Sequence, residues 1–254
     1  MSVAADLFPG IEVIDAHAHF GRWGYPGYGG DLDGFRRLLD VAGIAKVIVS
    51  SAQAICYDVP AGNAEVATAV ESDERIYGSI VFNARFPREA REQLEKYAGH
   101  PRFVAVKFHP AYTGLALNSP QNLRIIELVA DLDLPLTFHT WAGDGPAAAE
   151  IAKRFPTLPV VWFHSLAADY PVAAELARDL PNVYLDFVTS TQERGKIETL
   201  IAALGAERLL FGTDQSLLDP IRPLAAVAEA RLTESDRRKI LGENARKLFK
   251  FDRK

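Results

Sequence analysis

The chain has 254 residues, of which 48% are hydrophobic and 24% charged, and its formal net charge at pH 7 is −5. No run of Lys or Arg suggests binding to nucleic acid or an anionic membrane surface, and no apolar stretch reaches membrane-spanning length. Cys56 is the one cysteine, which excludes an intrachain disulfide and fits a reducing compartment. We therefore expect a cytoplasmic protein with no nucleic-acid or membrane partner.

Short apolar segments rich in Val, Ile and Phe recur along the chain. Their length and nearly continuous hydrophobicity are typical of parallel strands that are buried on both faces. Between them lie segments with apolar residues at i, i+3 and i+4, the spacing of one helix face. The predicted strands are 13–15, 46–49, 77–81, 104–107, 135–139, 160–164, 183–186 and 208–211. The predicted helices include 32–41, 64–70, 123–132 and 147–155.

This alternation predicts an α/β fold, a (β/α)8 or TIM barrel, built as a single domain over residues 1–254. A doubly wound open sheet shares the alternation, but it usually has fewer strands and often a Gly-rich turn after the first. A C-terminal helix is predicted over 233–250, because Thr233 and Asp236 have the spacing of a capping pair and apolar residues follow them. We expect this helix to pack on the outside of the barrel.

Two histidines, His17 and His19, stand one residue apart at the end of the first predicted strand. Residues i and i+2 of a strand point to the same face, so the two imidazoles project together. His139, His164 and Asp214 end the fifth, sixth and eighth predicted strands. The carboxyl ends of all barrel strands meet at one mouth. Imidazole nitrogens with one carboxylate suit Zn²⁺ and similar ions, so the sequence predicts a divalent metal site there.

This order of residues resembles that of the amidohydrolase superfamily. The segments Val106–Pro110, Asn182–Asp186, Phe211–Asp214 and Ile240–Ala245 resemble its amidohydrolase-related (amidohydrolase 2) branch in particular. That branch includes proteins like aminocarboxymuconate semialdehyde decarboxylase. The resemblance extends over nearly the whole chain and implies a barrel of the metal-dependent hydrolase type.

By this resemblance, His17, His19, His139 and Asp214 would be the metal ligands. Asp214 and His164 would be the catalytic residues. Asp214 would also accept a proton from water, and His164 would be an acid/base group or a ligand of a second metal. We expect one ion rather than two, with Zn²⁺ favoured and Mn²⁺ or Fe²⁺ as alternatives.

Four further residues are candidates for substrate binding. Lys107 and His109 share a face at the end of the fourth predicted strand, where some family members carry a carboxylated Lys or a Glu that bridges two metals. The alternative for Lys107 is an ammonium group that binds a substrate carboxylate. His109 either binds substrate or stabilises the turn that follows. Arg22 is a second cation for a carboxylate, and Trp141 either lines the pocket or packs in the core.

The loop over residues 21–30 directly follows the histidine pair and is rich in glycine and aromatic residues. Trp23, Tyr25 and Tyr28 can close over an apolar substrate, or the segment is a packed connecting loop. Active sites of barrels are built from loops at this end, so both interpretations remain open.

The main functional hypothesis is a metal-dependent hydrolase that uses a metal-activated water to cleave a small, carboxylate-bearing amide, ester or lactone. The first alternative is a metal-dependent non-oxidative decarboxylase of a small aromatic or enoic acid, with His164 moving a proton to carbon. The second is a non-catalytic barrel that binds a ligand. The expected partner is a small-molecule substrate, and a homodimer is possible.

Overall fold

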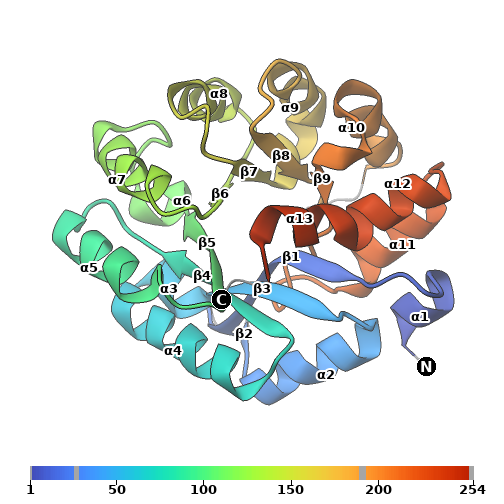
Figure 1. The fold of residues 1–254 in the computed structure, drawn as a ribbon, viewed down its shortest axis with the longest axis horizontal. Helices are drawn as coiled ribbons and strands as arrows, with labels where there is room; N and C mark the ends of the chain where they lie inside the picture. Colours follow the sequence, from blue (N-terminus) through green and yellow to red (C-terminus); the bar gives the residue numbers. More distant parts are fainter. Residues whose placement is uncertain (1, 26–28, 189–192, 252–254) are drawn as a thin grey trace.

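The computed structural model describes residues 2–25, 29–188 and 193–251. Eight parallel strands form a nearly closed barrel with helices around it, as Figure 1 shows. The order of the strands around the barrel follows the chain, and the short strand β2 pairs antiparallel with the edge of β1. The predicted (β/α)8 barrel is confirmed.

All eight predicted strands lie in the barrel. The first is longer than predicted because it pairs with β3 along most of its length and with β2 at its end. The strands are β1 (Ile14–Arg22), β2 (Gly29–Gly30), β3 (Lys46–Ser51), β4 (Ile76–Val81), β5 (Phe103–Phe108), β6 (Leu136–His139), β7 (Val160–Phe163), β8 (Val183–Asp186) and β9 (Leu209–Leu210).

The helices cover the outer face of the strands, and several begin at a polar capping residue. Asp31 accepts a hydrogen bond from the backbone N–H of Gly34 at the start of α2, and Ser119 does the same for Asn122 in α7. No described helix is long and apolar enough to cross a membrane. The α-helices are α1 (Val3–Leu7), α2 (Leu32–Ala42), α3 (Ala52–Cys56), α4 (Val59–Ser72), α5 (Pro87–Tyr97), α6 (Pro110–Thr113), α7 (Pro120–Ala130), α8 (Gly145–Arg154), α9 (Tyr170–Ala177), α10 (Lys196–Leu204), α11 (Ile221–Glu229), α12 (Glu234–Arg238) and α13 (Asn244–Phe249).

The C-terminal segment packs on the outside of the barrel only in part, since Ile240 and Leu241 join the layer between strands and helices but α13 does not. Its helical run is α12, a π-helical stretch over Lys239–Glu243, and α13. Leu248 and Phe249 join the cluster that fills the barrel interior, together with Ile14 at the start of β1. In Figure 1, α13 lies near the middle of the ring of strands. The helix therefore closes the amino-terminal end of the barrel, because this end would otherwise expose apolar interior side chains to water.

The barrel closes where β1 meets the segment that follows β9. The backbone N–H of Ala16 donates to the carbonyl of Phe211 at 2.9 Å, and the N–H of Asp214 donates to the carbonyl of His17 at 2.8 Å. The buried carboxylate of Asp15 reinforces this seam, since it accepts from the backbone N–H of Thr213 at 3.1 Å and from its hydroxyl at 2.5 Å. Closure of the barrel thus sets the position of Asp214 beside β1.

We expect Thr213→Val to lower the free energy of unfolding by about 1–3 kcal/mol, because it keeps the side-chain shape and removes a buried donor to Asp15. Thr68→Val is the matched control: Thr68 is exposed on α4, and this change should stay within about 0.5 kcal/mol of the wild type. Urea unfolding followed by circular dichroism measures both. Equal stabilities of the two variants would contradict this role of the hydroxyl.

Candidate metal centre

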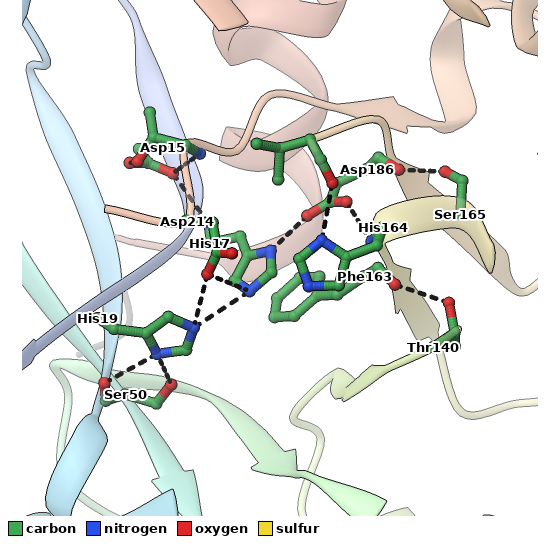
Figure 2. A network of polar contacts seen from close by, with 12 residues as sticks. Asp15, His17, His19, Ser50, Thr140, Phe163, His164, Ser165, Asp186 and Asp214 are labelled. Carbon is green, nitrogen blue, oxygen red and sulfur yellow. Dashed lines mark hydrogen bonds and ion pairs between the residues drawn. The ribbon is translucent and has the colours of Figure 1, made fainter. Parts of the chain in front are cut away.

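His17 and His19 project together from β1, as the sequence predicts. Their Nε2 atoms lie 3.2 Å apart. Oδ1 of Asp214 lies 3.2 Å from Nε2 of His19 and 3.6 Å from Nε2 of His17. Figure 2 shows the two rings and the carboxylate directed at one point. Two nitrogens that bind one zinc ion at 2.0–2.1 Å with a tetrahedral angle are about 3.3 Å apart, so this spacing fits ligands that share an ion.

His164 follows β7 and completes a compact group of donor atoms. One ligand atom each from His17, His164 and Asp214 lie within 4.8 Å of one another. Both His164 and Asp214 adopt left-handed backbone conformations, with φ of 71° and 56°. Such conformations are uncommon for residues other than glycine, and residues that adopt them are often found at functional sites.

An oxygen lies behind each of the three imidazoles, at its Nδ1 atom. For His17 it is Oδ2 of Asp186 at 2.6 Å, and for His164 it is the carbonyl of Val188 at 2.7 Å. For His19 the carbonyl of Ser50 lies at 3.2 Å and its hydroxyl at 2.9 Å. An imidazole that donates from Nδ1 presents a lone pair on Nε2, which is the form that binds a metal. The rings are therefore held with Nε2 directed into the site.

Gly212 allows this close approach. A Cβ atom at this position would lie 2.9 Å from Cβ of His17 and 3.0 Å from Oδ2 of Asp186. Both contacts are tighter than van der Waals packing allows, so a side chain here would displace the histidine or its carboxylate partner.

The site is buried, and burial dominates its electrostatics. Burial lowers the pKa of His17 well below its ordinary value, and lowers that of His164 to about 4. Burial raises the pKa of Asp186 well above its ordinary value. For Asp214, burial alone would raise the pKa, but the hydrogen bond with His19 and the nearby His164 hold it below the ordinary value. The group thus presents neutral imidazoles and an ionised carboxylate, which suit a divalent cation.

The other sequence-predicted ligand, His139, ends β6 and stands on the far side of His164. Its ring meets that of His164 edge-on, with centroids 4.5 Å apart, and stacks on His109 at 4.0 Å. Trp141 stacks on the opposite end of this row, 5.3 Å from His139 and nearly parallel to it. The three rings form one wall of the mouth.

Lys107 and Arg22 lie outside the wall formed by these three rings. Lys107 is buried beneath the donor atoms, with its Nζ 4.0 Å from the centroid of the Phe163 ring and no hydrogen-bond partner among the described residues. It lines a small interior cavity together with His17 and Ser79. Arg22 is exposed at the end of β1 and lines neither this cavity nor the cavities at the mouth.

A cavity of about 360 Å³ opens above the donor atoms. Its floor includes His19, His164 and Asp214, and its walls include His109, His139, Trp23, Tyr25, Ala111, Tyr112 and Leu217. Trp23 and Tyr25 belong to the predicted aromatic loop, and Tyr28 of that loop lies outside the described residues. The cavity is of the size and mixed lining that are usual for a small-molecule site.

Asp186 and Ser50 also belong to the site, although no role was predicted for either; each ends a predicted strand or lies just beyond one. The same strand-end rule that selected the histidines would have selected both. Asp186 connects two site residues, because its other oxygen accepts from the backbone N–H of His164 at 2.6 Å. Asp186 therefore positions His17 on β1 relative to His164, which follows β7.

The chain is similar to known proteins over nearly its whole length. A family model described as amidohydrolase matches residues 14–251, so the chain belongs to that family. A search of curated protein sequences found no match.

Solved structures with the same fold include several decarboxylases. One is 2,6-dihydroxybenzoate decarboxylase from Rhizobium, with a TM-score of 0.78 and 18% identity over 96% of this chain and 100% of the other. Another is 5-carboxyvanillate decarboxylase from Sphingomonas paucimobilis, with a TM-score of 0.76 and 16% identity over 94% and 99%. The corresponding enzyme from Novosphingobium aromaticivorans, complexed with manganese and a nitrobenzoic acid, gives 0.79 and 14% over 98% of each chain. At these identities, the likeness concerns the fold.

We expect Asp186→Asn to weaken divalent metal binding about 10- to 100-fold. One carboxylate oxygen of Asp186 already accepts from His164 N–H, so the amide NH₂ would face Nδ1 of His17 and force the proton onto Nε2. Isothermal titration with Zn²⁺ and with Mn²⁺ measures the affinity.

The control for this variant is Asp133→Asn, which changes an exposed carboxylate that pairs with Lys250 on the surface. It should leave metal affinity unchanged. Affinity of Asp186→Asn equal to that of the wild type would show that Asp186 does not set the orientation of His17.

Proposed function

We propose that this protein is a metal-dependent, non-oxidative decarboxylase of a small aromatic acid. The observation that carries the proposal is the convergence of His17, His19 and Asp214 beneath a cavity with aromatic walls. The carboxylate of a substrate would bind at the cation on the floor, and its flat ring would lie between the aromatic side chains.

Two considerations favour decarboxylation over the hydrolase hypothesis. The structural neighbours described above carry the names of decarboxylases of aromatic acids. The cavity is also mostly aromatic and apolar above its floor, which suits a benzoic acid better than a polar amide. Family membership itself is compatible with both reactions.

A divalent ion in this site would neutralise the substrate carboxylate and orient it by coordination. His17, His19 and Asp214 would hold the ion, with His139 and His164 on the side that faces the cavity. Imidazole and carboxylate ligands suit both Zn²⁺ and Mn²⁺, and we propose one ion. The manganese in the N. aromaticivorans complex makes Mn²⁺ the first ion to test.

The reaction needs one proton at the ring carbon that bears the carboxylate. Addition of that proton and cleavage of the carbon–carboxylate bond return the electron pair to the ring and release CO₂. His164 and Asp214 are the acid–base groups on the cavity floor besides His19. One of them first takes a proton from solvent and then delivers it to the ring carbon.

The direct test incubates the Mn²⁺-loaded or Zn²⁺-loaded protein with 2,6-dihydroxybenzoate in D₂O. The expected result is release of CO₂ and one deuterium on the product ring, detected by mass spectrometry. A chelator should abolish the reaction. No turnover of aromatic acids, with cleavage of a lactone, ester or amide and ¹⁸O uptake from water, would favour the hydrolase instead.

Two variants separate the roles of the floor residues. We expect His164→Asn and Asp214→Asn each to lower kcat by at least about 100-fold, as removal of general acid–base catalysis does. Metal content measured by mass spectrometry then distinguishes a ligand, which loses the ion, from a proton carrier, which keeps it. His100→Asn, which changes a partly buried histidine outside the site that pairs with Glu71, is the control and should retain full activity.

A further inference from the structure

A second cavity of about 480 Å³ lies directly beside the one above the metal centre. The two share Ala111 and His139 in their walls, so they are contiguous at the mouth of the barrel. We call the second cavity the annex. Its volume exceeds that of the site cavity, and the proposed reaction at the floor does not account for it.

The annex is lined mainly by apolar side chains. Leu115, Ala116 and Leu117 follow α6, and Trp141 follows β6. The remaining apolar residues are Pro110 and Ala111. Most of the wall can therefore contribute only apolar contacts, which favour a ligand group without charge.

Asp144 is the one ionisable residue of the annex besides His139, and none of the described lining residues is Lys or Arg. Oδ2 of Asp144 accepts from the backbone N–H of Trp141 at 2.7 Å, so the carboxylate also stabilises the turn over residues 141–144. An anionic group in the annex would meet this carboxylate with no cation to balance it.

A row of parallel rings connects the two cavities. His109 lines the site cavity, Trp141 lines the annex, and His139 between them lines both. The indole of Trp141 is 45% exposed although it is a large apolar group. A ligand that spans both cavities would cover this surface and would extend the wall from the metal centre outward.

We propose that the substrate is an aromatic acid that carries an uncharged apolar substituent, and that this substituent binds in the annex. The proposal rests on the proposed function, since the acid group is assigned to the metal centre. It adds that substrate selection depends on the far end of the molecule, through contacts with Leu115, Ala116, Leu117 and Trp141. An acid with a second carboxylate at that end would be rejected.

The test compares the parent acid, 2,6-dihydroxybenzoate, with two series of its alkyl derivatives. One series carries a methyl, propyl or pentyl group at the 3-position, and the other carries the same groups at the 4-position. Binding to the metal-loaded protein is measured by isothermal titration, independently of turnover. In at least one series, affinity should rise about two- to four-fold per methylene group, as apolar burial predicts. A homologue that ends in a carboxylate should lose this gain.

Ala116→Phe tests the location of the substituent, because Ala116 lines the annex and not the site cavity. The ratio of pentyl to parent affinity should fall towards one in this variant, and Ala116→Leu should give an intermediate ratio. Ala64→Phe, on the exposed face of α4, is the control and should keep the wild-type ratio.

The outcomes separate this inference from the proposed function. Affinity that does not change with chain length in either series, or a gain that survives in Ala116→Phe, overturns the inference even if the acids are decarboxylated. A gain that Ala116→Phe removes supports the annex. If this occurs without release of CO₂ from any acid, the proposed reaction is wrong and the binding assignment stands.

Discussion

The contact between β1 and the segment after β9 is the constraint on which the site depends. Asp15 bonds to Thr213 across a separation of 198 residues, and the backbone of His17 bonds to that of Asp214. This seam closes the barrel and places a carboxylate from the end of the chain against two imidazoles from its beginning. The same hydrogen bonds that stabilise the fold therefore assemble the metal centre, so stability and site geometry cannot be varied separately here.

Burial gives the site its chemical character. Neutral imidazoles and carboxylates lie together in a region where water is largely excluded, and an unpaired charge there is costly. Asp186, Ser50 and Val188 offset part of this cost with oxygens behind the rings. A divalent cation would offset more of this cost, because it would stabilise the carboxylates and bind the lone pairs on the Nε2 atoms of the histidines. The floor of the site cavity would then bind the charged group of a ligand, and the annex would bind its apolar part.

Much of the fold was predictable because a parallel strand buried on both faces has a sequence signature of its own. All eight predicted strands lie in the barrel. The predicted position of the C-terminal helix was right only for Ile240 and Leu241, because an apolar helix face does not specify which apolar surface it covers. The open end of the barrel supplied the surface, and Leu248 and Phe249 pack there. At the site, strand-end position selected His17, His19, His139, His164 and Asp214, whose roles stay predictions, and it gave no role to Asp186.

The amino-acid pattern alone predicts the alternation of strands and helices, and with it the mouth at which the histidines and Asp214 meet. These follow from local hydrophobic periodicity and from the geometry of one strand. Packing in three dimensions sets which atoms lie within reach of one ion, buries Lys107 beneath them, and places an apolar annex beside the site cavity. Those features depend on contacts between residues far apart in the chain, and local patterns carry no information about such distances.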